Sequence, residues 1–296
     1  MGALGGAAAA GADYSTIINP SIKASSYYLA IPFGVTYKMG KYLSASVGGR
    51  TLSATNKVES SITMSGSATA LPDQTLGIDA EYTASGFGWV FALNASTDDG
   101  YNFSVRYETQ AELEFETKIN NDDFGLIDTA DLKDRRDLPA VLAFGVRIDA
   151  CPKWKVFADA NFYFQSRANW DTVVYHNGKE QLNKIAGNAA MYCIATQFEA
   201  STKLNIGAGL TYTKYSWKNQ TGYYNVSLGS FEVVQANNLT INLGLKYNFT
   251  EKIAGTLAYM NVMYASDKQI KFDPLGTMVT VNNSANVLGY GINLTF

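Results

Sequence analysis

Residues suited to covalent or metal chemistry are few in this chain. Of 296 residues one is a histidine, His176, and two are cysteines, Cys151 and Cys193. A catalytic triad or a metal site would have to be built around that single histidine, which lies in a turn-like segment. The sequence contains no phosphate-binding glycine loop and no cysteine cluster. We therefore expect no enzyme activity, no catalytic residue, no metal and no cofactor, and we interpret His176 as a solvated loop residue.

Arginine offers a different chemistry, because a guanidinium group binds a carboxylate through two parallel hydrogen bonds. Four arginines occupy polar positions in segments of alternating hydrophobicity: Arg50, Arg106, Arg147 and Arg167. Each could hold the carboxylate of an organic acid. More often such arginines pair with acidic residues of the chain, such as Glu108 or Asp159, and the sequence leaves both interpretations open.

The arginines lie in segments whose alternation predicts long strands. In the segment 101–117, Tyr107, Leu113 and Phe115 fall on one face, and Arg106 and Glu108 fall on the other. Strands are expected at about 26–38, 42–57, 84–96, 101–117, 139–150, 154–168, 187–199, 203–217, 237–249, 253–267 and 286–296. These segments are long enough to cross a membrane, which takes about 9–11 residues, whereas globular strands usually have about 5–6.

The connections between these strands alternate in length. Tight turns are expected at 39–41, 97–100, 150–153, 200–202 and 250–252, and long polar loops at about 58–83, 118–138, 169–186, 218–236 and 268–285. This pattern is typical of an all-β, antiparallel, up-and-down transmembrane barrel. A charge facing hydrocarbon costs about 2–4 kcal/mol, so the four arginines should face the lumen.

Composition argues against other classes of protein. No window contains 18 consecutive apolar residues, so a helical membrane protein is disfavoured. The net charge of −3 and the lack of a basic stripe indicate no nucleic-acid partner.

The last strand carries an apolar face that ends on the carboxy-terminal residue, Phe296. Such an ending resembles the signature of bacterial outer-membrane barrels. It implies the outer membrane of a Gram-negative-type bacterium as the location, outer-membrane lipid as the environment, and the barrel-assembly machinery as a partner that contacts this strand.

The first residues fit this organisation poorly. Residues 1–25 are interpreted as an N-terminal segment, the remnant of a loop or a weak strand, and 26–296 as the barrel. The segment 1–13 is rich in small residues but is not a complete signal peptide. Bacterial barrels prefer an even strand number, so either 14–24 supply a twelfth strand or upstream strands are missing. We favour the second alternative, because the missing signal peptide points the same way.

The middle of the chain resembles a known family of outer-membrane proteins. Gly86-Phe-Gly-Trp89, a strand, a short turn and Phe103-Ser-Val-Arg-Tyr107 are similar to the hairpin motif of FadL-type long-chain fatty-acid and hydrocarbon transport proteins. In this chain the order of Tyr and Arg is inverted. Asp137-Leu-Pro-Ala140, followed by the segment 142–159, is similar to that family's next motif.

The resemblance implies a fourteen-strand barrel, of which about eleven or twelve strands are visible in this sequence. It also implies an amino-terminal hatch and a hydrophobic path from an outer-loop groove to a lateral or periplasmic exit. The hatch and about three early strands are not recognisable. The function implied is passive transport of a hydrophobic small molecule, a long-chain fatty acid or a related compound.

A landing groove for such a molecule would need apolar residues in the outer loops. The candidates are Leu71, Leu76, Phe124, Leu126 and Ile127. The alternative is that these side chains pack the loops against each other. Two other functions stay open: a general porin for small polar solutes, and a surface-exposed structural or adhesive barrel.

Overall fold

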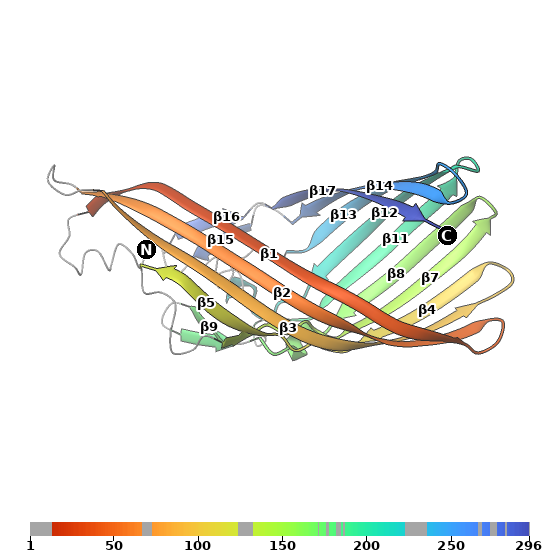
Figure 1. Ribbon diagram of the computed structural model, residues 1–296, viewed down its shortest axis with the longest axis horizontal. Helices are drawn as coiled ribbons and strands as arrows, with labels where there is room; N and C mark the ends of the chain where they lie inside the picture. The colour runs from red at the N-terminus through yellow and green to blue at the C-terminus, as the bar shows by residue number, and fades with distance from the viewer. Residues whose placement is uncertain are drawn as a thin grey trace.

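The computed structural model describes residues 14–66, 73–123, 133–170, 172–175, 178–181, 185, 187–222, 236–265, 268–272, 277–281 and 283–295. Most of these residues form a large antiparallel sheet that curves into the wall of a barrel (Figure 1). Among them, no helix has the length and apolar character needed to cross a membrane.

Eleven strands follow one another along the wall in chain order. They are β1 (Tyr14–Lys38), β2 (Leu43–Gly66), β3 (Gln74–Ser96), β4 (Tyr101–Glu108), β7 (Val141–Cys151), β8 (Trp154–Tyr163), β11 (Ala189–Glu199), β12 (Leu204–Tyr215), β13 (Asn238–Asn248), β14 (Ile253–Tyr264) and β17 (Ser284–Leu294). The prediction of an antiparallel up-and-down barrel sheet is confirmed. Strands β1 and β17 stand at the two ends of the path, and no ladder joins them within the described residues.

The remaining elements lie on the side of the long loops. They are β5 (Glu114–Asp122), β6 (Lys133–Arg135), η1 (Gln165–Arg167), β9 (Thr172–Tyr175), β10 (Gly178–Gln181), β15 (Lys268–Phe272) and β16 (Thr277–Val281). Strand β5 pairs with β3 and β6, while β9 with β10 and β15 with β16 form small separate hairpins. Figure 1 shows these elements at one end of the barrel and the tight turns at the other.

The first three strands are much longer than predicted. Residues 14–24 are the beginning of β1, so they form neither a twelfth strand nor a segment separate from the barrel. Residues 58–66 and 74–83, expected as part of a loop, extend the β2–β3 hairpin. Hydrogen bonds such as Thr63 Oγ1 to Thr75 Oγ1, 2.9 Å, accompany this ladder. Leu76, Ile78 and Tyr82 of β3 do alternate with polar residues, but the polar composition of the whole segment favoured a loop.

Two predicted strands end earlier than expected. The segment expected as one strand at 101–117 is divided, because β4 stops at Glu108 and β5 starts at Glu114. Strand β8 stops at Tyr163 and is followed by the 3-10 turn η1. Both breaks occur at the long-loop end of the wall, where they shape the interior described below.

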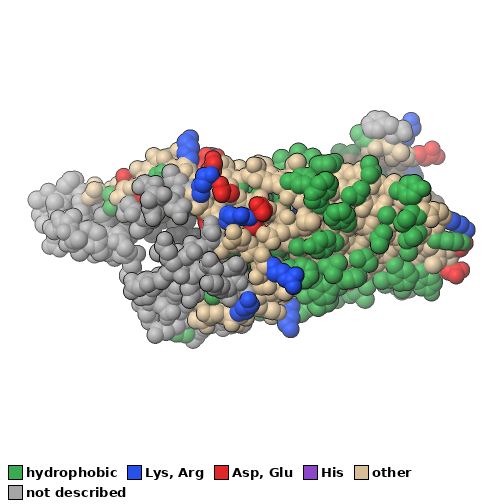
Figure 2. Space-filling view, turned by 90° about the horizontal axis from the view of Figure 1, so that it is seen from below, with side chains coloured by type: hydrophobic (Ala, Val, Ile, Leu, Met, Phe, Trp, Pro, Cys, Tyr) green, Lys and Arg blue, Asp and Glu red, His purple; other side chains and the backbone are tan. Residues whose placement is uncertain are grey.

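An apolar belt surrounds the barrel. Figure 2 shows it as a band on the half of the molecule nearest the tight turns, with charged side chains at both borders. Its large exposed side chains include Val35, Trp89, Phe91, Tyr107, Phe144, Ile194, Leu210, Leu243, Leu257 and Ile292. Half of the Trp89 surface and half of the Leu243 surface are exposed, which indicates a lipid environment rather than water.

Aromatic side chains border the belt at the tight-turn end. Exposed rings there belong to Tyr37, Tyr42, Tyr101, Trp154, Tyr247 and Phe249. Phe296 lies outside the described residues. The turns carry their usual chemistry, since Gly40 and Gly100 have φ values of 103° and 85°, which only glycine adopts easily.

Candidate functional site

The face of the sheet opposite the apolar belt is the lumen face. Strand pairing places Arg50 beside Gly88, Glu108 beside Val90, and Arg106 beside Ala92. These positions alternate with Trp89, Phe91 and Tyr107, whose side chains are exposed on the belt. Arg50, Arg106 and Glu108 therefore lie on the lumen face, as predicted from the cost of charges in hydrocarbon.

Two guanidinium groups share one buried carboxylate on this face. Nη1 of Arg50 lies 2.5 Å from Oε2 of Glu108, and Nε of Arg106 lies 3.2 Å from Oε1. The Glu108 side chain is 10% exposed and that of Arg106 is 49% exposed. Nε of Arg50 is buried and has no hydrogen-bond partner among the described residues. One carboxylate does not use all the donors of two arginines.

The other two predicted arginines lie elsewhere. Arg147 pairs with Asp149 at 3.1 Å, in the part of β7 that leads to a tight turn. Arg167 belongs to η1, beyond the end of β8, and its guanidinium carbon lies 5.6 Å from the centre of the Phe164 ring. The expectation that Arg167 faces the lumen from a strand fails, because the strand ends four residues earlier.

Beyond Glu108 the chain turns out of the sheet onto the lumen face of β3. The backbone N–H of Thr109 still donates to the carbonyl of Trp89. The next residues cross over two glycines: a Cβ built at Gly86 would lie 2.8 Å from Cδ2 of Leu113, and one at Gly88 would lie 3.5 Å from Cβ of Ala111. The missing side chains at positions 86 and 88 leave the space for this crossing.

The crossing builds an apolar cluster on the lumen face. Its buried members are Leu52, Ala54, Ala84, Ala111, Leu113 and Phe115, with Tyr82 and Leu138 packed against them. Leu113 is 0% exposed and Phe115 is 2% exposed. The Phe115 ring also meets the edge of Tyr28 at a centroid distance of 6.5 Å. Leu52 is two residues from Arg50 on the same face, so the lumen apolar cluster borders the arginine pair.

A buried aspartate fixes the crossing segment. Asp137 is 1% exposed and accepts hydrogen bonds from Nε2 of Gln110 at 2.6 Å and from the backbone N–H of Leu113 at 3.0 Å. Nε and Nη2 of Arg135 also donate to its carboxylate, at 3.2 and 2.9 Å. The carbonyl of Asp137 accepts from Nε1 of Trp170 at 2.8 Å. One side chain thus joins the crossing segment to the chain that leads into β7.

The crossing also interrupts the barrel wall. Strand β3 pairs with β4 from Val90 to Ser96 and with β5 from Ile78 to Thr83, and Trp89 is hydrogen-bonded to Thr109, so the interval without a partner in either ladder is 84–88. On the belt side of this interval lie the rings of Phe33, Phe87 and Trp89, with centroid distances of 6.2 Å for the first pair and 5.1 Å for the second. An apolar surface outside the wall therefore lies opposite the apolar cluster inside it.

The predicted loop groove is only partly visible. Leu76 lies in β3, half-buried and opposite Ile62 of β2, so it belongs to a paired hairpin rather than to a loop. Leu71, Phe124, Leu126 and Ile127 lie outside the described residues, as does His176. Within the described residues, no group of three or more histidine, cysteine, aspartate or glutamate side chains is placed to hold a metal ion.

The sequence interpretation missed the lumen apolar cluster. Leu113 and Phe115 are an even number of residues from Tyr107. In one uninterrupted strand all three side chains would lie on the same, lipid-facing side. One signal was present: position 109, which should continue the apolar face, is a threonine followed by Gln110. A polar pair in the middle of a predicted strand marks the place where the chain changes faces.

Comparison with known proteins gives structural neighbours only. No protein-family model matches the chain, and no curated protein matches it significantly in sequence. A solved FadL homologue of Pseudomonas aeruginosa superimposes with a TM-score of 0.61 at 12% identity, covering 91% of this chain and 67% of that protein. The toluene transporter TodX of P. putida gives 0.59 at 13% identity, covering 92% of this chain and 70% of that protein.

A TodX mutant described as a monoaromatic hydrocarbon channel gives a TM-score of 0.56 at 14% identity, covering 83% of this chain and 66% of that protein. The chain thus spans about two thirds of the length of these neighbours. At such identities the similarity concerns architecture, and it shows that the chain has the β-barrel fold of FadL-type outer-membrane proteins.

Proposed function

We propose that this chain forms an outer-membrane channel through which a hydrophobic molecule passes without energy coupling or covalent chemistry. The FadL homologue and the hydrocarbon channels that share its fold support this class of function. The observation that carries the proposal is the lumen apolar cluster, whose partly buried members Tyr82 and Leu138 border a fully buried centre at Leu113 and Phe115. A channel for small polar solutes gains nothing from such a surface, whereas an acyl chain gains about 0.8 kcal/mol for each buried CH₂ group.

The substrate that fits best is a long-chain fatty acid. Its tail would lie against Tyr82 and Leu138, the partly exposed residues of the lumen apolar cluster, and its carboxylate would reach Arg50 and Arg106, which border that cluster. The Arg106 side chain is 49% exposed and can be reached from the lumen, and a carboxylate is the acceptor that a guanidinium binds most strongly. A monoaromatic hydrocarbon would use the apolar cluster alone.

The interruption of the wall at residues 84–88 supplies a route for the ligand toward the bilayer. The rings of Phe33, Phe87 and Trp89 outside the interruption would receive an apolar molecule that leaves the lumen. In this arrangement the outer-membrane lipid is the acceptor, the protein resides in that membrane, and the barrel-assembly machinery recognises the last strand. The loop residues Phe124, Leu126 and Ile127 are proposed as the outer landing groove.

A binding measurement tests the proposal. The full chain, folded in detergent, is titrated with radiolabelled oleate and with methyl oleate. We expect saturable binding of both ligands, tighter for the acid. Arg50→Met should remove the preference for the acid, a loss of about 1.5–3 kcal/mol or roughly tenfold or more in affinity, while binding of the ester is unchanged.

Other results of these measurements would favour a different function or a different substrate. Ion conductance in planar bilayers without binding of either ligand would favour the general porin. Equal binding of acid and ester by the unmodified chain would favour an uncharged hydrocarbon as the substrate. If Phe124, Leu126 and Ile127 can all be changed to serine without loss of affinity, the proposed landing groove is rejected.

A further inference from the structure

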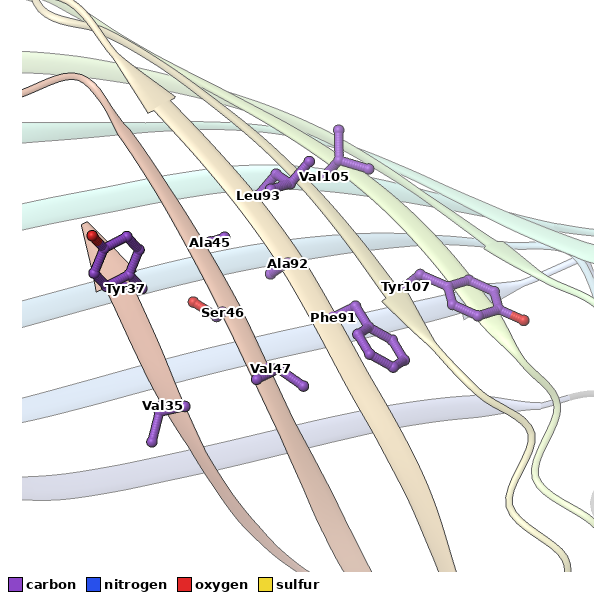
Figure 3. A pocket seen from close by; sticks show the side chains of 10 residues that line it. All are labelled: Val35, Tyr37, Ala45, Ser46, Val47, Phe91, Ala92, Leu93, Val105 and Tyr107. Atoms are coloured by element: carbon purple, nitrogen blue, oxygen red, sulfur yellow. The ribbon is translucent and has the colours of Figure 1, made fainter. Parts of the chain in front are cut away.

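A recess lies on the belt side of the first four strands, away from the lumen. Its volume is about 480 Å³, and its lining residues are Val35, Tyr37, Ala45, Ser46, Val47, Phe91, Ala92, Leu93, Val105 and Tyr107. Figure 3 shows these side chains along four neighbouring strands. Strand pairing places Tyr37, Ala45, Leu93 and Val105 in one row and Val35, Val47, Phe91 and Tyr107 in the next.

The recess exists because a small side chain stands between large ones. Ala45 pairs with Tyr37 on one side and with Leu93 on the other. A methyl group between a tyrosine and a leucine leaves a furrow in a surface that is otherwise level. The flanking side chains are exposed, Tyr37 to 72% and Leu93 to 52%, so no described segment of the chain covers the furrow.

The position of the recess along the barrel is defined by the turn that follows β1. Tyr37 is one residue from the end of β1, and Ala45 is two residues after the start of β2. Strands rise about 3.4 Å per residue, so the recess lies in the part of the apolar belt next to the tight turns. Immediately beyond it lie Lys41 and Tyr42, which both contact Asp98, at 2.7 and 2.5 Å.

We propose that this recess is a binding site for one acyl chain of a membrane phospholipid in the leaflet on the tight-turn side. The furrow is continuous with the lipid-facing belt, and its lining is almost wholly apolar. The polar groups of Lys41 and Tyr42 stand where the headgroup of such a lipid would lie. This site lies on the opposite face of the wall from Arg50 and Leu113, and it borders the proposed exit, because Phe33 and Trp89 are two residues from Val35 and Phe91 of the recess lining.

A lipid tail suits the recess better than a protein surface does. Within hydrocarbon there is no hydrophobic force between apolar surfaces, so binding depends on close packing. An unfilled furrow would lose the dispersion contacts of its walls. A flexible acyl chain can follow the furrow, whereas a second barrel would contact only the exposed rings of Tyr37 and Phe91 that flank it.

Photocrosslinking tests the site. The full chain is folded into phosphatidylethanolamine vesicles that contain a phospholipid with a diazirine on one acyl chain, and the labelled peptides are identified by mass spectrometry. We expect labelling of the recess to exceed labelling of the belt around Leu210 and Leu243 by about threefold, the ratio that packing energies within membranes allow.

Two matched variants test whether the label comes from an acyl chain that occupies the recess. Ala45→Phe fills the furrow and should reduce its labelling to the level of the belt. Ala158→Phe, a change at an exposed alanine of β8, should leave recess labelling unchanged. Heat-modified mobility on gels confirms that both variants fold, and oleate binding should be normal in both.

Uniform labelling of the belt in the unmodified chain, or undiminished labelling in Ala45→Phe, would overturn the proposal. Displacement of the label by equimolar oleate would also overturn it, because the recess would then belong to the transported molecule. If the unmodified chain does not bind oleate, the proposed transport function is rejected, and the proposal of the lipid site is not affected.

Discussion

Gly86 of β3 lies directly beneath Leu113, so that a Cβ at position 86 would stand 2.8 Å from Cδ2 of that leucine and would also collide with the carbonyl oxygen of Glu112. This pair of residues connects the wall of the barrel with its interior. The chain can cross onto the lumen face because position 86 carries no side chain, and the crossing brings Leu113 and Phe115 inside.

Replacing Gly86 with alanine should disturb the crossing. The contact with Glu112 involves backbone, which cannot move aside as a flexible side chain can. We expect a loss of about 1–3 kcal/mol in the free energy of unfolding, together with weaker oleate binding. Gly291→Ala is the matched control, because a Cβ at that position would meet no described atom within 4 Å. Urea denaturation of both variants makes the comparison, and equal stabilities would contradict the account.

Asp137 should be the residue on which the crossing segment most depends. The change Asp137→Asn removes the charge that Arg135 and Gln110 bind, and it should cost about 2–3 kcal/mol, the range for hydrogen bonds to charged groups. The exposed Asp99 provides the control, since Asp99→Asn should change stability by less than about 0.5 kcal/mol. Protease digestion should cut Asp137→Asn faster near residues 109–113. An unaltered cleavage pattern would show that Asp137 does not hold this segment.

Glu108 should compete with the ligand for Arg50 and Arg106. In Glu108→Gln the two guanidinium groups lose their shared carboxylate and repel each other, so the barrel should be less stable. A fatty-acid carboxylate would supply the negative charge that the two guanidinium groups then lack, and we expect oleate affinity to rise about tenfold, or about 1.4 kcal/mol, without a change for methyl oleate. Calorimetric titration gives both affinities. A parallel change for acid and ester would exclude a carboxylate site at this position.

The tight turns should show a pH dependence at Asp98. Hydrogen bonds from Lys41 and then from Tyr42 hold the pKa of Asp98 below its ordinary value of 3.8. The stabilisation is therefore complete above the ordinary carboxyl pKa, and it is lost as the pH falls through the lowered value. An NMR titration of the carboxyl carbon should show this lowered pKa, and Lys41→Met should bring it closer to 3.8. An identical titration in both proteins would exclude the Lys41 contact.

The sequence was sufficient to predict the wall of the barrel but not its interior. Alternation located the strands that cross the membrane, because hydrocarbon on one side and a polar lumen on the other force every second residue to be apolar. The same rule placed Arg50, Arg106 and Glu108 on the lumen face.

Two features were not found in this way. The outer half of β3 does alternate, at Leu76, Ile78 and Tyr82, but polar residues around it, such as Thr63 and Thr75, favoured a loop. The change of face between Tyr107 and Leu113 depends on a contact with Gly86, which is distant in sequence, and on Asp137, which is also distant. Alternation describes neighbouring residues along a strand, and it contains no information on such contacts.

The most direct test of the transport function is uptake by cells. Gram-negative cells that lack their own long-chain fatty-acid channel would express the full chain or its Gly86→Ala variant, with equal amounts of folded protein verified in the outer membrane. We predict saturable uptake of radiolabelled oleate with the unmodified chain and a markedly lower rate with the variant. Absence of uptake by the unmodified chain, or equal rates for both proteins, would contradict the proposal that a hydrophobic ligand passes over the lumen apolar cluster.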